Sequence, residues 1–409
     1  MRPPSARRAS RGRPATAAPA ARPGRATAPA AAEGPAAPGP SAPATFRKLS
    51  AAGVGPSFRD VAAVVTAEAR APGPGEVMVR VAYAGVNGGC ETFRARGDHA
   101  FGFLRGRGAF DLGAEGCGTV EAVGEGVGGL AVGDAVTFVG GAFAEVAYPK
   151  AAACRRVDRC SAEAVALCLS GVTAAVGVEA TGRCAPGMSV LVTAAAGGTG
   201  HFAAQLAARA GARVFATCGT RAKAARLRAV GVHRPIVHTE ESVAAVLRAE
   251  CPRGLDLAYE GVGGEMLSAA VEHLAPGGLV MVVGYISGYP HARQSDAGAG
   301  RGPGGPAPAD GPRARAPGWD LPPEEEIFWG RLEVAGPGGR RVVGDVYRCT
   351  PEERAACRER VFELHARGEL EAWVDPEPFV GIERVPDAVD WMLSGRSTGK
   401  VVARIGGGP

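Results

Sequence analysis

Residues 188–223, "MSVLVTAAAGGTGHFAAQLAARAGARVFATCGTRAK", decide how the chain is interpreted. An apolar run breaks into glycines, an alanine-rich stretch of helical composition follows, and a second short apolar run comes after it. This order is typical of a strand, a phosphate-binding turn, a helix and a second strand. We therefore predict a dinucleotide-binding turn here. A tight turn that packs a helix on a sheet without any ligand is the alternative.

The alternation of strands and helices continues beyond this stretch and predicts an α/β fold. After residue 164 it predicts a doubly wound parallel sheet, that is, a Rossmann domain. Short β-like runs with glycine-rich turns occur earlier, at residues 46–163, and predict a small, mostly antiparallel barrel. The strands expected in the sheet are 189–193, 213–217, 235–238, 255–259, 279–283 and a sixth candidate at 342–347.

The patterns divide the chain into four segments. Thr350, Pro351 and Gly368 mark the start and end of an expected helix in "TPEERAACRERVFELHARGELEAWV". The helix opens a final piece that returns to the first domain, where "STGKVVARI" reads as a strand. The segments are a tail at 1–45, the barrel domain at 46–163, the Rossmann domain at 164–350 with a Gly/Pro-rich insertion at about 290–340, and the return at 351–409.

Composition excludes several classes of function. The chain has 409 residues, 46% of them hydrophobic, which suits a soluble protein of two packed domains. The net charge of +5 comes from the tail, where Glu33 is the one acid, so no nucleic-acid partner is expected. The window 184–208 is free of formal charge, but it contains Pro186, a glycine cluster and Gln205 and fits a strand, turn and helix better than a membrane span. Ten cysteines without C-x-x-C spacing indicate neither a disulfide scaffold nor a structural zinc site.

The tail is rich in Arg, Ala, Ser and Pro and has no apolar core of a secretory signal. This composition predicts an organelle transit peptide, for a mitochondrion or a plastid. An untargeted extension of a cytoplasmic protein is the alternative.

Small residues in the turn would let the backbone approach a pyrophosphate, next to the positive end of the following helix. Ala194, Gly197 and Gly200 stand where the glycines of a dinucleotide fingerprint would stand, with Gly198 and Thr199 beside them.

The end of the second strand predicts which nicotinamide cofactor is used. An acid there would bind the ribose 2′-hydroxyl of NAD, and "VFATCGTRAK" has none. Thr217, Arg221 and Lys223 would instead suit a 2′-phosphate, so we predict NADPH. A solvated basic helix face is the alternative reading of the two cations.

Several motifs together carry a resemblance that covers about Phe46 to Ile405. The chain resembles a zinc-independent medium-chain dehydrogenase/reductase of the quinone oxidoreductase type, in the branch of the prostaglandin reductases. The motifs are "AGVN" (84–87), "FDLGAEGCGTVEAVG" (110–124), "GAFAEVAY" (141–148), "LVTAAAGGTG" (191–200), "YEGVGG" (259–264), "YISGY" (285–289) and "STGKVV" (397–402).

The resemblance implies a GroES-like barrel, a Rossmann domain and catalysis without metal. Zinc-dependent relatives have a cysteine where this chain has Asn87 and Gly-His-Glu where it has "GAE" at 113–115. The implied reaction is hydride transfer from NADPH to the C=C bond of an α,β-unsaturated ketone, or to a quinone. Tyr289 matches the tyrosine expected to hydrogen-bond the substrate ketone, and Asn87 matches an amide beside the nicotinamide. Phe93 departs from the family, which often has a tyrosine there.

Some expectations stay open at this stage. Reduction of 2-enoyl thioesters, or a non-catalytic NADPH-binding role, would use the same fold. The segment after Tyr289 is expected to be a long loop without a helix, in which Trp319, Phe328 and Trp329 form either an apolar lid or a patch for a second subunit. The family also implies a homodimer, with the strand at 342–347 at the edge of the sheet.

Overall fold

The computed structural model describes residues 44–53, 55, 57–89, 109–289 and 318–406, and the fold has the two expected kinds of sheet. The first is a mostly antiparallel sheet in the order β16-β17-β3-β5-β6-β8, with β7 paired to β3. A smaller sheet, β2-β1-β4, accompanies it. These strands are β1 Thr45–Ala51, β2 Ala62–Glu68, β3 Val77–Gly85, β4 Phe110–Asp111, β5 Glu115–Val123, β6 Ala135–Val139, β7 Val146–Ala147, β8 Cys154–Arg156, β16 Phe379–Val380 and β17 Val402–Arg404.

The second sheet has seven strands in the order β11-β10-β9-β12-β13-β15-β14. All its neighbours pair in parallel except β14 and β15. The five strands predicted with most support are all present, within a few residues of the predicted ends. The bounds are β9 Ser189–Val192, β10 Arg213–Cys218, β11 Arg234–Val237, β12 Leu255–Glu260, β13 Leu274–Val282, β14 Glu333–Ala335 and β15 Arg341–Val343.

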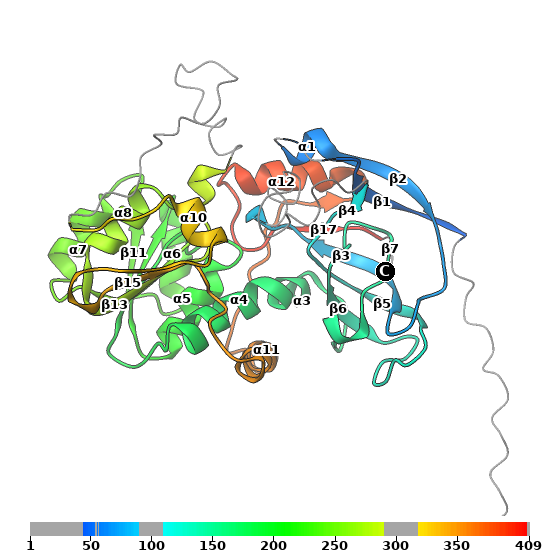
Figure 1. The fold of residues 1–409 in the computed structure, drawn as a ribbon, viewed down its shortest axis with the longest axis horizontal. Helices are drawn as coiled ribbons and strands as arrows, with labels where there is room; N and C mark the ends of the chain where they lie inside the picture. The colour runs from blue at the N-terminus through cyan, green and yellow to red at the C-terminus, as the bar shows by residue number, and fades with distance from the viewer. Residues whose placement is uncertain (1–43, 54, 56, 90–108, 290–317, 407–409) are drawn as a thin grey trace, which may run out of the picture. The chain divides into compact units, whose positions relative to one another are not determined.

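Helices cover both faces of this sheet, as Figure 1 shows. α5 (Gly200–Arg209) and α6 (Arg221–Ala229) share an apolar cluster with Val190 and Val192 of β9. On the opposite face, α7 (Val243–Glu250) and α8 (Glu265–Glu272) cluster with Leu191. Alternate residues of one strand therefore serve two cores, which explains why residues 190–192 of β9 are all apolar.

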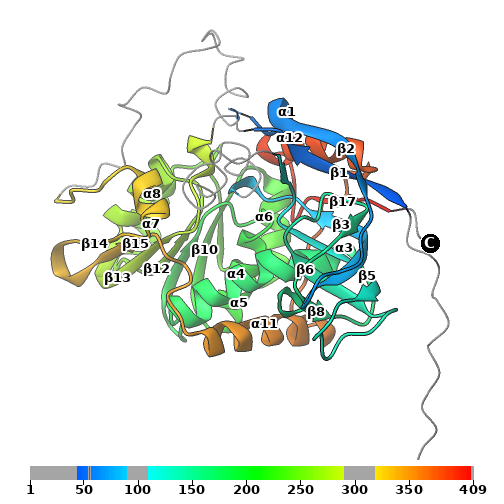
Figure 2. The ribbon, with the colours of Figure 1, turned by 45° about the vertical axis from the view of Figure 1, so that its right-hand side comes forward.

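A continuous helical run, residues 162–181, leads into the parallel sheet. By length and hydropathy it could cross a membrane, which the sequence reading missed, but 72% of its most apolar window is buried inside the protein. α11 (Pro351–Ala366) packs against this run and lies below α4 in both views (Figures 1 and 2). The run consists of α3 Ala162–Ala166, a π-helical turn Leu167–Gly171, α4 Val172–Ala175 and a second π-helical turn Val176–Thr181.

The expected C-terminal helix is α11, Pro351–Ala366. Thr350 caps it, with its hydroxyl accepting from the Glu353 N–H and the Glu353 carboxylate accepting from the Thr350 N–H. The chain then returns to the barrel, where β17 pairs with β3. The remaining helices are α1 Phe58–Val61, α10 Glu324–Trp329 and α12 Val385–Leu393, with 3-10 turns at Ala151–Ala153, Ile286–Gly288, Pro337–Gly339 and Ile382–Arg384.

The prediction of a helix-free loop after Tyr289 is wrong for residues 324–329, which form α10. Three glutamates occupy its first turn, where their negative charges interact favourably with the positive end of the helix dipole and stabilise the helix. Pro323 precedes the helix. The Gly/Pro content of the whole segment had hidden this local pattern. Residues 290–317 lie outside the described part of the chain.

The predicted edge strand is also wrong. β15 covers only 341–343 and lies inside the sheet, because Glu333–Ala335 adds as β14 on its outer side. Within the described residues, β14 is therefore the edge strand at this end of the sheet, and β11 is the edge strand at the other end. A homodimer stays a prediction, and it would now pair through β14.

Candidate active site

The predicted phosphate turn lies between the end of β9 and the start of α5. Ala194 has a left-handed backbone, with φ of 46°, which turns the chain sharply. A methyl group on Gly200 would lie 2.4 Å from the Ala194 carbonyl oxygen, so only glycine fits there. Within the described part of the chain, the N–H groups of Thr199 and Gly200 have no acceptor, whereas Gly197 and its neighbours pair with Gly399 in a parallel bridge. A row of free N–H groups at a helix start suits a pyrophosphate.

Strand β10 holds this turn from the side. The Thr217 hydroxyl accepts from the Ala194 N–H at 3.1 Å, and the Thr217 carbonyl accepts from the Ala195 N–H at 2.9 Å. Thr217 is buried, at 1% exposure. Its side chain therefore shapes the turn, and a direct contact with a 2′-phosphate stays a prediction.

The returning chain supports the turn from the other side. The Gly399 N–H donates to the Ala196 carbonyl at 2.8 Å. His201 bridges the turn and the return, with Nδ1 bonded to the Gly197 carbonyl at 2.8 Å and Nε2 accepting from the Trp373 N–H at 3.0 Å. The imidazole also stacks on the Trp373 ring, at 5.2 Å between centroids.

These contacts require a neutral His201, because Nε2 faces an N–H donor and needs its lone pair. Burial lowers the pKa of His201 to about 3. The turn is thus fastened by an imidazole that stays uncharged over the physiological pH range.

The two predicted 2′-phosphate cations are both near the start of α6, and both have partners. Arg221 is largely exposed and donates to the Glu240 carboxylate at 2.9 Å. Lys223 donates to the Gly395 carbonyl at 2.9 Å, and burial lowers its pKa. Glu240 comes from the loop after β11, so the absence of an acid in the β10 segment did not reveal this carboxylate.

A buried polar cluster lies beside the turn, and it includes Asn87. The ammonium of Lys400 contacts Glu115 Oε1 at 2.6 Å, Asn87 Oδ1 at 2.7 Å and Ser170 Oγ at 3.1 Å. Asn87 Nδ2 donates to Glu115 Oε1 at 2.8 Å. Lys400 is 1% exposed and Glu115 0%. We call these four residues the amide cluster.

The first π-helical turn completes this cluster. Leu169 lies within it, and the Leu169 N–H donates to Glu115 Oε2 at 2.8 Å. Ser170 of the same turn faces Lys400. Single π-helical turns inside helices are frequent at functional sites, and here the turn supplies two of the contacts that hold the buried charges.

Tyr289, the other candidate donor, lies close to Asn87. A methyl group on Gly88 would be 3.4 Å from Tyr289 Cε2, and one on Gly284 would be 3.3 Å from the Tyr289 hydroxyl oxygen. The ring therefore runs from the residue after Asn87 toward the loop that follows β13. Tyr289 is 4% exposed.

An aromatic group supports Tyr289. Tyr285 packs edge-on against Tyr289 at 5.1 Å and against Phe328 at 5.9 Å, and its hydroxyl accepts from Trp329 Nε1 at 2.9 Å. Trp319 packs elsewhere, against Gly336. Of the three aromatics expected to act together, Phe328 and Trp329 thus back the Tyr285–Tyr289 pair, and Trp319 does not.

The end of β12 carries a second buried acid, Glu260. It accepts from the Thr193 hydroxyl at 3.1 Å and from the N–H groups of Val262 and Gly263 at 2.8 and 3.0 Å. Burial raises the pKa of Glu260 to about 7. Glu324 of α10 accepts from the Gly264 N–H at 2.6 Å, so α10 is fastened to the same turn.

Sequence reasoning missed Lys400, Glu115, His201 and Glu260 as parts of the site. Three of them stood in quoted motifs, "STGKVV", "GAE" and "YEGVGG", without an assigned role. Lysine is scarce in this chain, with 4 lysines against 42 arginines, and that scarcity could have singled out Lys400.

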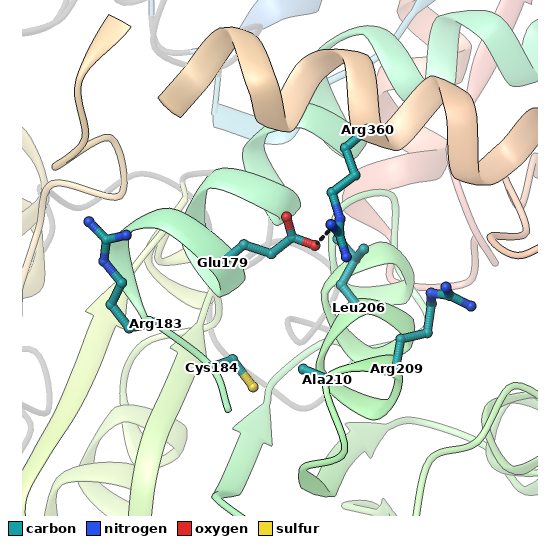
Figure 3. Close-up of a pocket in the computed structure, with 7 residues that line it drawn as sticks. All are labelled: Glu179, Arg183, Cys184, Leu206, Arg209, Ala210 and Arg360. Carbon is teal, nitrogen blue, oxygen red and sulfur yellow. Dashed lines mark ion pairs between the residues drawn. The ribbon is translucent and has the colours of Figure 1, made fainter. Parts of the chain in front are cut away.

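A separate pocket lies at the far end of α5 from the phosphate turn (Figure 3). It has a volume of about 390 Å³, and its centre is the ion pair between Glu179 and Arg360, 3.0 Å apart. Arg209 and Ala210, at the end of α5, also line it. It shares no residue with the turn or the amide cluster.

No group of three or more His, Cys, Asp or Glu side chains suited to a metal occurs in the described ranges. Catalysis without zinc stays a prediction. Cys90 and Phe93 belong to residues 90–108, outside the description.

A barrel joined to a doubly wound sheet, with polar side chains beside the first strand-to-helix turn of that sheet, is the architecture of a two-domain oxidoreductase. Two family models match the chain: "Alcohol dehydrogenase GroES-like domain" over residues 73–195 and "Zinc-binding dehydrogenase" over residues 198–298.

Relatives agree with these matches. Mouse prostaglandin reductase-3 is 34% identical, with 89% of this chain and 90% of the relative covered. A probable quinone oxidoreductase of Leishmania amazonensis is 33% identical, with 89% of this chain and 99% of the relative covered. The structure of Escherichia coli quinone oxidoreductase with NADPH superposes with a TM-score of 0.67, at 21% identity over 88% and 99% of the two chains. The chain belongs to the medium-chain dehydrogenase/reductase family and is an oxidoreductase.

His201 predicts a pH dependence of stability. Its folded-state pKa lies below the ordinary 6.5, so the unfolded chain binds the proton first as the pH falls. The contribution of His201 is complete above pH 6.5 and declines toward pH 3, by about 1 kcal/mol per pH unit. Urea unfolding of wild type and His201→Gln at pH 7.5 and 5.0 measures it.

The difference in unfolding free energy between the two proteins isolates the contribution of His201. Glu260, whose raised pKa stabilises the fold as the pH falls, contributes equally to both proteins. We expect the difference in unfolding free energy between wild type and His201→Gln to be smaller at pH 5.0 than at pH 7.5. Parallel pH dependences of the two proteins would contradict a neutral, bridging imidazole.

Proposed function

We propose that the protein reduces the C=C bond of α,β-unsaturated ketones, or quinones, with NADPH and without a metal. The observation that carries the proposal is the position of Asn87. Its amide, bonded to Lys400 and Glu115, lies beside a turn whose free N–H groups suit a pyrophosphate. A hydride donor and a hydrogen-bond donor would then meet at one place.

The cofactor fits the residues that are present. The N–H groups of Thr199 and Gly200 would bind the pyrophosphate at the start of α5. Lys223 and Arg221 would face the 2′-phosphate at the start of α6, with Glu240 competing for Arg221. NADPH, when bound, supplies the hydride.

The chain's own part of the reaction is to bind and polarise the substrate oxygen. As hydride reaches the β-carbon of an enone, negative charge builds on the carbonyl oxygen, and a fixed donor stabilises it. The Asn87 amide and the Tyr289 hydroxyl are the candidate donors. Tyr285, Phe328 and Trp329 would keep Tyr289 in place and exclude water.

The names of the relatives support two substrate classes, and we propose 15-keto-prostaglandin-like enones as the first to test. NADPH oxidation would be followed with 15-keto-prostaglandins, small alkenones, quinones and 2-enoyl thioesters. Turnover of enones or quinones supports the proposal. Turnover of thioesters alone would favour the enoyl reductase alternative, and tight NADPH binding without any turnover would favour a non-catalytic role.

An organellar location and a homodimer remain part of the proposal. The Arg-, Ala- and Ser-rich tail supports the first, although residues 1–43 lie outside the described structure. The family and the free side of β14 support the second.

The Tyr289→Phe variant tests the carbonyl donor. If the hydroxyl bonds the oxygen as charge builds, kcat should fall about 10- to 1,000-fold, with a smaller change in KM. Asn87→Ala should lower kcat and weaken NADPH binding together, because the amide borders the nicotinamide position. Steady-state kinetics and NADPH fluorescence titration measure both.

Tyr148→Phe is the matched control for loss of a tyrosine hydroxyl. Its oxygen accepts from the Arg70 N–H, away from the site, so kcat should stay at the wild-type value. Full activity of Tyr289→Phe on every enone would remove Tyr289 from the mechanism.

Lys223→Ala tests the cofactor preference. Loss of the ammonium should lower kcat/KM for NADPH about 10-fold or more and leave the value for NADH nearly unchanged. Glu240→Gln should act in the opposite direction, because Arg221 loses its competing carboxylate. Lys150→Ala removes a remote lysine and is the control. An unchanged NADPH to NADH ratio in Lys223→Ala would refute the assignment.

A further inference from the structure

We propose that Lys400 is a positioning residue: with Glu115 it fixes the side-chain amide of Asn87 so that one N–H points to the substrate oxygen. The inference deepens the proposed function and rests on it for the nature of that oxygen. The orientation of the amide can be tested without any substrate.

The shape of the cluster requires a lysine. Three acceptors surround the ammonium, on Glu115, Asn87 and Ser170, at 2.6 to 3.1 Å. An ammonium has three N–H groups that spread in three directions, whereas a guanidinium is a flat fork. A chain with 42 arginines and 4 lysines has a lysine here, where geometry demands it.

The two charges determine which way the amide faces. Its oxygen meets the Lys400 ammonium and its nitrogen meets the Glu115 carboxylate. A flipped amide would set N–H groups against the cation and an oxygen against the anion. Both changes are unfavourable in a buried site, so the ion pair selects one orientation.

One N–H of Asn87 is left over. The amide nitrogen carries two hydrogens, and one of them binds Glu115. Within the described residues the second has no acceptor, and Asn87 is only partly buried. Asn87 can therefore offer this second N–H to a ligand, which suits an oxygen that gains negative charge.

Lys400 also connects the amide to the phosphate turn. Its neighbour Gly399 donates to Ala196 in the turn at 2.8 Å, and a methyl group on Gly198 would lie 3.3 Å from Lys400 Cδ. The same residue thus contacts the turn with its stem and the amide with its tip. This arrangement fixes the distance between the cofactor and the donor.

The test uses a pair of substitutions, because Lys400→Met alone would leave Glu115 as a buried, unpaired charge. Lys400→Met with Glu115→Gln removes both charges and keeps the volume. Arg360→Met with Glu179→Gln removes the remote ion pair of Figure 3 and is the matched control. Lys400→Arg keeps the positive charge but replaces the ammonium by a flat guanidinium. This variant tests the proposal if the double variant does not fold.

Asn87 is the sole asparagine of the 409-residue chain, so labelling asparagine side-chain nitrogen with ¹⁵N gives one amide pair in an NMR spectrum. In wild type we expect one proton of the pair to be shifted downfield by its bond to the carboxylate. In the double variant and in Lys400→Arg the pair should move or broaden, and in the control it should not. An unchanged pair in both site variants would overturn the proposal.

Kinetics give a second readout in a cycle with Asn87→Ala. We expect the double variant and Asn87→Ala each to lower kcat about 10- to 100-fold, and their combination to lower it no further. Losses that multiply would show that Lys400 acts independently of Asn87 and would overturn the proposal. A wild-type protein without turnover on any substrate would refute the proposed function, and the NMR result would still decide the orientation of the amide.

Discussion

A lysine ammonium and a glutamate carboxylate are buried together, 2.6 Å apart, and the site depends on their being fully paired. A buried charge without partners costs several kcal/mol, so every remaining hydrogen-bonding position has to be filled. The partners come from distant parts of the chain: Asn87 follows β3, Glu115 begins β5, Leu169 and Ser170 come from the helical run, and Lys400 precedes β17. The barrel, the helical run and the returning chain must therefore meet at this point.

The same requirement explains local irregularities that would otherwise weaken the fold. A regular α-helix at 167–171 would use the Leu169 N–H within its own ladder, and Glu115 Oε2 would lose a donor. A charged His201 would oppose the Trp373 N–H, so burial keeps it neutral. In the first case the Glu115 carboxylate gains a donor because the helix is irregular. In the second case His201 can accept from the Trp373 N–H because the imidazole does not take up a second proton.

The sequence predicts the elements much better than it predicts the contacts between them. The turn at 194–200 and the cap at Thr350 are encoded within a few residues, and both occur where their local patterns place them. The amide cluster joins residues up to 313 positions apart, and no local pattern encodes such a contact. α10 and the edge strand β14 were missed because short elements in a Gly/Pro-rich region give too few residues for a periodic pattern. Glu240 was missed for a third reason, since it reaches Arg221 from the loop after the neighbouring strand.

The amide cluster also bears on the prediction that this protein works without zinc. By the resemblance, zinc-dependent relatives have a cysteine at the position of Asn87 and a histidine and a glutamate in the segment that ends at Glu115. Here the cation next to these positions is the Lys400 ammonium, 2.7 Å from Asn87 Oδ1 and 2.6 Å from Glu115 Oε1. A metal ion is a Lewis acid that a substrate oxygen can bind directly, whereas this ammonium is saturated by protein acceptors. Its charge can reach the substrate only through the polarised amide of Asn87, a weaker electrophile than a metal. Such a site suits conjugated enones and quinones, whose acceptor carbons are already activated by the substrate's own carbonyl groups.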